Sequence, residues 1–462
     1  MTGRRGPTER VAHYIAETGF AAAPPELERQ TGRAIVDLVA ATIAAREDPG
    51  FGVLRRVVAG ESKEGPCTVL ATGERTTPAM AALLNGAAGH ALDYDDVADA
   101  LYGHPTVTIV PPLLAVAEAR GLSGRALVEA YNIGFDVAVA IAQALPVKAH
   151  FDRGWHATAS IGVLSATAAL CRLVGLDPTR IRHALGIAAS HVGSSRQNFG
   201  TMTKPLHPGS SSMSAVLATR LAEEGFTADP DQWEKPLGYF ATFGVASDLD
   251  ALHRSLEEPY ALLRDGLSFK KYPCCYNTHR SADAAIALAA AMPAAARASI
   301  DKVTLTLQPS GTDPLIHHRP TTGLQGKFSA EYVVAAGLVD GEVSLMSFRD
   351  DAVRRPRIQE LVRRVELRES PVPPIGDRSW DFAYAVLEVA AGGRVYRERV
   401  DVPRGDCRRP LGEDELDAKF LRAVEYSGAG WNAQALLRDI RGLPARARLD
   451  GFASLTRDPP RA

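Results

Sequence analysis

The sequence predicts a mainly α-helical fold, in which a large helical domain is formed by both ends of the chain and a smaller α+β lid domain is inserted into it. Three observations predict this class. Residues 1–267 consist of successive helical segments separated by short Gly- or Pro-bearing turns, with almost no period-two alternation. Residues 268–408 contain alternating stretches typical of strands. Residues 409–462 return to a helical pattern, which we expect to rejoin the first domain.

In the first segment, helix starts can be predicted from capping signals. A helix is expected in the segment that Pro24 and Pro25 open, because apolar residues after them recur near the helical period. Ser123 is an N-cap candidate for a long helix through Ala144. Asp177 followed by Pro178 gives a cap and a first-turn proline for the next helix.

The inserted segment mixes both periodicities. An Ala-rich helix is expected over residues 281–298, and two more helices over 329–339 and 351–364. Apolar alternation and β-branched residues predict strands. These strands are expected at 303–307, 365–367, 384–389 and 394–400.

The amino-acid composition excludes several classes of protein. The 462 residues are 46% hydrophobic and 23% charged, which supports a large buried core and excludes extensive disorder. Lys plus Arg (52) nearly equals Asp plus Glu (54), so nothing favours nucleic-acid binding. The five cysteines form neither a CxxC pair nor a disulfide framework, as in a reducing cytoplasm. With no signal peptide or membrane span, we expect a soluble cytoplasmic protein without a membrane partner.

The first polar cluster extends from His90 to Asp99 and is followed closely by His104. His90, Asp93 and Asp96 lie three apart, so on a helix they would share one face. Four carboxylates lie within residues 93–99, and their repulsion can raise a pKa toward the range of a general base. The alternative interpretation is a solvated helix end.

The second cluster, NFGTMTKPLHPG, extends from Asn198 to Gly209. Its glycines allow unusual backbone conformations, and Pro205 fixes the chain after the lysine. Such a segment can hold Lys204 and His207 toward a common point. An ordinary loop with a surface lysine is the alternative interpretation.

The third cluster, KKYPCCYNTH, extends from Lys270 to His279 at the expected domain junction, where clefts commonly form. The adjacent Cys274 and Cys275 suggest buried packing more than a redox couple, because a disulfide between neighbours is strained. His156 stands alone, and such a histidine is more often part of a core than of a site.

Together, these positions supply positive charge and proton donors without a phosphate-binding glycine loop. The cationic set comprises His104, His156, Lys204, His207 and Lys270. This combination favours a small polycarboxylate ligand, on which the cations stabilise negative charge as an α-proton leaves. We expect such chemistry to lead to elimination, decarboxylation or epimerisation.

These motifs resemble the MmgE/PrpD family, whose members include 2-methylcitrate dehydratase, cis-aconitate decarboxylase and iminodisuccinate epimerase. The similar segments are GHALDYDD (89–96), GHP (103–105), NFGTMTKPLHPG (198–209), KKYPCCYNTH (270–279) and the weaker GKFSAEY (326–332). The resemblance implies a helical domain built from both termini, an inserted lid domain and a homodimer. It also implies that no metal or organic cofactor is used.

By position, the resemblance implies a pocket made of two sets of residues. The catalytic set is Asp93, His104, His156, Lys204 and Lys270, and the substrate-binding set is His207, Cys275, Thr203 and Asn198. Asp93 would act as a base or orient one. The two catalytic histidines would move protons or bind carboxylates, and the two lysines would pair with carboxylates.

The chain also departs from the family pattern. Val97 replaces a threonine, and Ser210 replaces an arginine, which suggests a smaller or less charged substrate than a tricarboxylate. Cys275 stands where the decarboxylase tends to carry a histidine, which counts against decarboxylation.

The leading hypothesis is therefore a cofactor-independent lyase for a di- or tricarboxylic acid, most like 2-methylcitrate dehydratase. A pocket base would remove a proton α to a carboxylate, cations would stabilise the aci-carboxylate, and a protonated histidine would assist the departure of hydroxide. Epimerase or decarboxylase activity is the nearest alternative.

Two other classes are weighed against it. Residues 95–99 read DDxxD, a pattern that binds magnesium and diphosphate in helical isoprenoid synthases, but the second metal-binding motif is missing from the sequence. A non-catalytic helical scaffold is the third class. It predicts that replacing Lys204 or His104 changes neither ligand affinity nor turnover.

Overall fold

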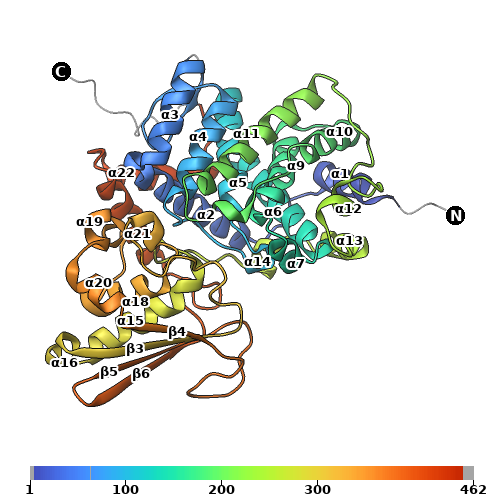
Figure 1. Ribbon diagram of the computed structural model, residues 1–462. Coiled ribbons are helices and arrows are strands. Elements are labelled where there is room, and N and C mark those ends of the chain that lie inside the picture. Colours follow the sequence, from blue (N-terminus) through green and yellow to red (C-terminus); the bar gives the residue numbers. More distant parts are fainter. Residues whose placement is uncertain (1–4, 63, 451–462) are drawn as a thin grey trace. The chain divides into compact units, whose positions relative to one another are not determined.

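The computed structural model describes residues 5–62 and 64–450. It is 57% helix and 8% strand, which confirms the prediction of a mainly helical protein (Figure 1). The chain divides into two compact units. The first contains the chain up to Asn198, Met202–Leu267 and the chain from Glu413, and the second contains Phe199–Thr201 and Ser268–Gly412.

Among the described residues of the first unit, the regular secondary structure is helical apart from one pair of two-residue strands. Its longer helices are α1 (Pro7–Glu17), α2 (Pro25–Ala44), α3 (Pro49–Glu61), α4 (Pro78–Ala91), α5 (Thr106–Arg120), α6 (Gly124–Ala144), α9 (Gly162–Val174), α10 (Pro178–Ala189), α11 (Thr203–Glu223), α13 (Leu249–Glu257), α21 (Glu413–Tyr426) and α22 (Ala433–Arg441). Its shorter helices are α7 (Val147–Asp152), α8 (Ala157–Ser160), α12 (Tyr239–Phe243) and α14 (Ala261–Arg264). The strands β1 (Cys67–Thr68) and β2 (Arg75–Thr76) are antiparallel.

The predicted helix starts are confirmed. Pro25 occupies the first position of α2, where a missing N–H costs nothing. The Ser123 hydroxyl accepts a hydrogen bond from the Ala126 N–H at the start of α6. Asp177 caps α10 in the same way.

Two glycines allow α4 and α11 to pack closely. A Cβ added to Gly209 would lie 2.5 Å from the Leu83 carbonyl oxygen, and one added to Gly86 would lie 2.9 Å from the Gly209 Cα. Only residues without a side chain permit this approach. The glycine that ends KPLHPG therefore serves helix packing inside α11.

We expect Gly209→Ala to destabilise the protein by about 1–3 kcal/mol, because the added methyl group meets main-chain atoms that cannot move aside cheaply. Urea unfolding would measure the change. Gly32→Ala is the matched control, since a Cβ at this helical glycine meets nothing within 4 Å. The control should gain about 0.5–1 kcal/mol from helix propensity. Equal effects of the two substitutions would contradict the packing argument.

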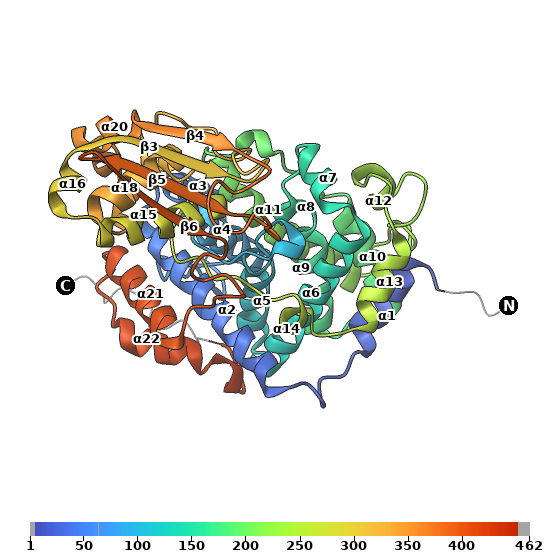
Figure 2. The same cartoon turned by 90° about the horizontal axis from the view of Figure 1, so that it is seen from below.

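The C-terminal segment belongs to the same unit as the N-terminal one. Figure 2 shows α21 and α22 beside α2. Glu413, the first residue of α21, forms ion pairs with Arg29 and Arg33 of α2. Deeper in this contact, Lys419 reaches Asp37, with 2.6 Å between Nζ and Oδ1.

The longest apolar helical stretch lies inside the first unit. Ala157–Val174 is apolar and long enough to cross a membrane, but 89% of it is buried within the protein. The stretch is also interrupted, because α8 ends at Ser160 before α9 begins. It therefore has the burial of a core helix.

The second unit contains a four-stranded sheet with the order β4-β3-β5-β6. Its strands are β3 (Ile300–Leu307), β4 (Val365–Glu369), β5 (Ala385–Ala391) and β6 (Arg394–Val400), and all four lie where the sequence predicts strands. β3 pairs with β4 in parallel, and the other pairs are antiparallel. Helices α15 (His279–Ala291) and α18 (Ala330–Asp340) cover one face of the sheet (Figure 1).

Two predicted helices in this unit are each divided by a proline. The helix expected over 281–298 is α15 followed by α16 (Ala294–Ala298), with Met292 extended before Pro293. The helix expected over 351–364 is α19 (Asp350–Val353) and α20 (Pro356–Val362), with Arg355 extended before Pro356. The prediction of continuous helices was wrong because a proline disfavours the helical conformation of the residue before it.

Candidate functional site

A polar cluster in the first unit is assembled from the ends of helices that are distant in the sequence. His90 lies in the last turn of α4, and Asp93 and Asp95 lie in the turn that follows. His104 precedes α5, His156 precedes α8, and Lys204 and His207 lie in the first two turns of α11. The shared helical face predicted for His90, Asp93 and Asp96 is wrong, because α4 ends at Ala91.

The turn after α4 directs its carboxylates to different partners. Asp93 adopts a φ of 52°, a left-handed conformation that aspartate tolerates better than most residues. Its side chain faces Lys204, whereas that of Asp95 faces two histidines. Asp93, Asp95 and Asp96 are at most 3% exposed, so the solvated helix end is also wrong for these residues.

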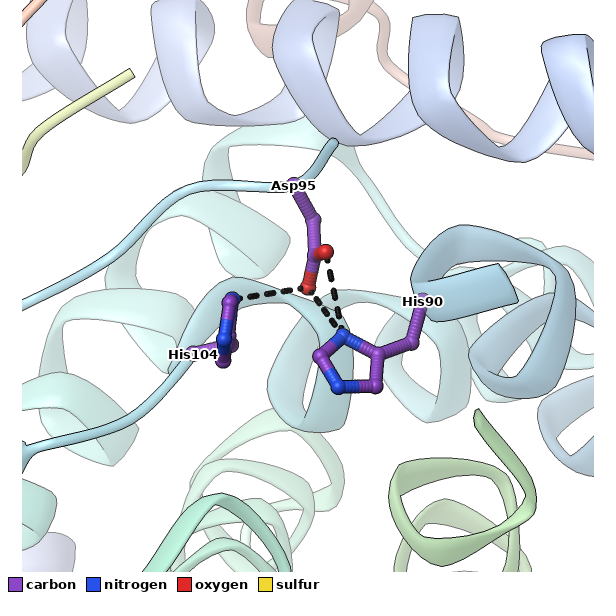
Figure 3. A group of neighbouring side chains, drawn as sticks. All are labelled: His90, Asp95 and His104. Atoms are coloured by element: carbon purple, nitrogen blue, oxygen red, sulfur yellow. Dashed lines mark hydrogen bonds and ion pairs between the residues drawn. The ribbon is translucent and has the colours of Figure 1, made fainter. Parts of the chain in front are cut away.

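Asp95 bridges His90 and His104 (Figure 3). His90 Nδ1 lies 3.0 and 2.9 Å from the two carboxylate oxygens, and His104 Nδ1 lies 3.3 Å from Oδ2. Burial by itself raises the pKa of Asp95, but the contacts with the two histidines outweigh it and hold that pKa well below its ordinary value. Asp95 is therefore an ionised acceptor that fixes both rings.

His90 is held as a neutral ring. Burial lowers its pKa to about 3, despite the opposing attraction of Asp95. Its Nδ1–H can then donate to Asp95, which leaves the lone pair on Nε2, and Nε2 is buried without a hydrogen-bond partner. His90 and Asp95 are missing from the predicted site residues. Their position within the motif GHALDYDD could have identified them from the sequence.

Lys204 and Asp93 form a buried ion pair with 2.5 Å between Nζ and Oδ1. Lys204 is 5% exposed and lies in the first turn of α11, so the alternative of a surface lysine in a loop is wrong. An ammonium at a helix N-terminus opposes the helix dipole. Asp93 offsets that unfavourable position.

The histidines continue as a connected group. His90 contacts His104 and His156, with ring centroids 4.5 and 5.7 Å apart. His156 Nδ1 lies 3.0 Å from His207 Nδ1, so one of the two nitrogens carries a proton and the other accepts it. Burial, followed by the charge of Lys204, holds the pKa of His156 well below its ordinary value and lowers the pKa of His207 to about 4.

The burial of His207 predicts a pH-dependent stability. A histidine in the unfolded chain titrates near pH 6.5, whereas His207 in the folded protein titrates at about 4. Between these values only the unfolded state binds the proton, so His207 costs about 1.4 kcal/mol of stability per pH unit of acidification. Asp37 and Asp136 act in the opposite sense, because burial raises the pKa of each to about 6.

The difference between wild type and His207→Asn isolates this contribution. In urea unfolding between about pH 6.5 and about pH 4.5, the variant should lose stability less steeply, by roughly 1 kcal/mol per pH unit. The exposed His191, replaced by Asn, is the control and should keep the wild-type slope. Parallel curves for His207→Asn and wild type would contradict the assignment.

The remaining predicted site residues are Asn198, Thr203, Lys270 and Cys275. Asn198 and Thr203 are partly buried and lie just before and at the start of α11. Lys270 and Cys275 are buried but belong to the second unit, so their participation stays a prediction. Cys275 and its neighbour Cys274 are free thiols, as the packing interpretation predicts.

The bridge formed by His90, Asp95 and His104 is also the group that could hold a metal ion. One ligand atom from each lies within 4.8 Å of the others. His90 Nδ1 faces both Asp95 oxygens as a proton donor would, and a metal at that nitrogen would have to displace the proton. The DDxxD interpretation is not favoured, because residues 95–99 follow the end of α4 and Asp95 is engaged by imidazoles.

A mostly helical unit that buries imidazoles, carboxylates and an ammonium in one cluster holds the groups that acid–base chemistry on a small anion would need. Comparison with protein families shows to which family the chain belongs. Residues 9–251 match the MmgE/PrpD N-terminal domain, and residues 272–438 match the MmgE/PrpD C-terminal domain. The chain belongs to the MmgE/PrpD family.

Similar proteins include cis-aconitate decarboxylases. The mouse enzyme is 31% identical over 360 residues, which cover 75% of this chain and 72% of that protein. The human enzyme is 29% identical over 80% of this chain and 77% of its own. The Aspergillus terreus enzyme is 24% identical over 90% and 89%. These relatives support an enzyme of the lyase class.

Proposed function

We propose that this protein is a decarboxylase acting on cis-aconitate or a closely similar unsaturated tricarboxylic acid. The main observation behind this proposal is the buried cluster of imidazoles with Lys204. The relatives of this chain that are cis-aconitate decarboxylases indicate the reaction. These relatives favour decarboxylation over the leading sequence-based hypothesis, a 2-methylcitrate dehydratase. Cys275 still favours the dehydratase as the second candidate, since the decarboxylase tends to carry histidine there.

The reaction needs one proton and the movement of two electron pairs. The bond between the methylene carbon and its carboxylate breaks, and CO₂ leaves. The released pair forms a new double bond to the central carbon, while the electrons of the old double bond take a proton at the neighbouring CH. The products are CO₂ and an unsaturated dicarboxylic acid, so atoms and charge balance.

His104 is proposed as the proton donor. The Asp95 carboxylate, 3.3 Å from His104 Nδ1, stabilises positive charge on that ring and directs Nε2 away from itself. His90 holds Asp95 from the other side. His156 and His207 share a hydrogen bond between their Nδ1 atoms, so the neutral ring that accepts in it carries its own proton on Nε2 and would donate to a remaining carboxylate.

Lys204 is proposed to stabilise the substrate carboxylate on which charge grows. Its Asp93 partner keeps the ammonium in place until the anion arrives. An ammonium in a buried site stabilises such charge more than it would in water. The resemblance also implies Lys270 and Cys275 as site residues, and both belong to the second unit.

Product analysis in heavy water tests the proposal. We expect incubation with cis-aconitate to release CO₂ and to give a product that carries deuterium at the former alkene carbon. NMR would detect this deuterium. Parallel incubations use citrate, 2-methylcitrate and an N-substituted aspartate. Dehydration of 2-methylcitrate without release of CO₂ from cis-aconitate would overturn decarboxylation in favour of the dehydratase. The activity should persist in EDTA. If EDTA abolished the activity and magnesium restored it, the proposal of a metal-free site would be rejected.

A further inference from the structure

We propose that Lys419, from the C-terminal helix α21, is a positioning residue that holds the turn carrying Asp93 and Asp95 in its reactive geometry. This inference rests on the proposed function. It assigns to the returning C-terminal segment a role in the chemistry of a site whose other members come from residues 90–207.

Lys419 makes its contact at the centre of the turn. Its Nζ donates to the Tyr94 carbonyl oxygen at 2.7 Å, and Tyr94 lies between the two site carboxylates in sequence. The same Nζ donates to Asp37 Oδ1 at 2.6 Å and lies 3.9 Å from the centre of the Tyr94 ring. Three contacts on one buried ammonium fix both the main chain and the ring of Tyr94.

The charges around Lys419 make it the cation of an acidic interior. Its side chain is 3% exposed, and Asp37, Asp95 and Asp96 all act on it. Asp37 Oδ2 and Asp96 Oδ2 are buried without hydrogen-bond partners. Burial, followed by the charge of Asp37, holds the pKa of Asp96 well above its ordinary value. Without the ammonium, Asp37 would lose the opposite charge that offsets its repulsion from Asp95.

The conformation of the turn explains why such support is needed. Asp93 has a positive φ, which costs a non-glycine residue energy that surrounding contacts must supply. Lys204 holds the Asp93 side chain and His90 holds that of Asp95, but Lys419 holds the main chain between them. A small displacement of a catalytic group changes rates strongly, by about 100-fold for 1 Å.

The experiment compares Lys419→Met with the double variant Asp37→Leu/Lys419→Met. Exchanging both members of a buried ion pair for apolar residues often restores stability, whereas removing one leaves a buried charge. The double variant should therefore recover the thermal stability that the single variant loses, yet keep a kcat about 100-fold below wild type because the bond to Tyr94 is absent. Arg172→Met is the matched control, since Arg172 also donates to main-chain carbonyls, those of Ile15 and Ala16 in α1. It should lose stability and keep kcat.

A second readout does not depend on turnover. This readout is the NMR resonance of the hydrogen-bonded Nδ1–H of His90 in ¹⁵N-histidine-labelled protein, assigned by its absence in His90→Gln. The chemical shift of this resonance should change in the double variant and stay unchanged in Arg172→Met. An unchanged His90 signal together with a restored kcat in the double variant would overturn the inference. Failure of the double variant to fold would also overturn it, because Lys419 would then have a purely structural role. If wild type shows no turnover while the signal responds as expected, only the proposed function fails.

Discussion

Replacing Lys204 by methionine is expected to lower kcat/KM by about 10²–10³-fold, because the site loses the buried ammonium that stabilises the growing negative charge. Methionine keeps much of the length and apolar volume of the side chain, so α11 should retain its packing. Steady-state kinetics with cis-aconitate, together with deuterium incorporation, would measure the loss.

Two controls separate the charge from the fold. Lys235→Met removes an exposed lysine from the same unit and should leave kinetics unchanged. Lys204→Met/Asp93→Asn removes the uncompensated carboxylate and should recover stability without recovering activity. Wild-type kinetics in Lys204→Met would reject the site and support the non-catalytic scaffold.

The second large effect is expected for Asp95→Asn, which should lower kcat by about 10²–10⁴-fold. An amide cannot accept from His90 and His104 as a carboxylate does, and it no longer stabilises positive charge on the His104 ring. The preferred tautomers of both rings are thereby lost. We expect KM to change much less than kcat.

Asp136→Asn provides the matched control for a buried carboxylate. Asp136 accepts from the Tyr14 hydroxyl and from the Ala261 N–H, and these contacts join α6 to α1 and α14. Its replacement should lower the unfolding temperature while kcat stays near wild type. Equal kinetic losses in the two variants would mean that Asp95 acts only through stability.

The decarboxylase proposal revises the order of the sequence-based hypotheses. Val97 and Ser210 suggested a smaller or less charged substrate than a tricarboxylate, and Cys275 counted against decarboxylation because the decarboxylase tends to carry a histidine there. Relatives that match most of the chain are cis-aconitate decarboxylases, and they support decarboxylation, which the sequence analysis had kept as an alternative. Single substitutions at the margin of a motif are therefore weaker guides to the reaction than similarity over the whole chain.

Local signals account for what the sequence predicted well. Ser123 and Asp177 cap helices because their side-chain oxygens accept from nearby N–H groups, and the four strands follow from period-two alternation. The same reasoning failed at Pro293 and Pro356, where the helical composition on both sides outweighed the proline in the prediction. Family-like motifs pointed to Asp93, His104, Lys204 and His207, and His156 was implied only by its position in the resemblance.

By itself, the sequence determined the helical class, most element positions and the residue types available for acid–base chemistry, because these depend on neighbours along the chain. Only the tertiary structure decided which groups meet. The left-handed turn at Asp93 sends its carboxylate to Lys204 and that of Asp95 to two histidines, and the close packing at Gly86 and Gly209 brings α4 and α11 together. Partner choice and burial arise from contacts between distant segments, and they set the pKa values on which the chemistry depends.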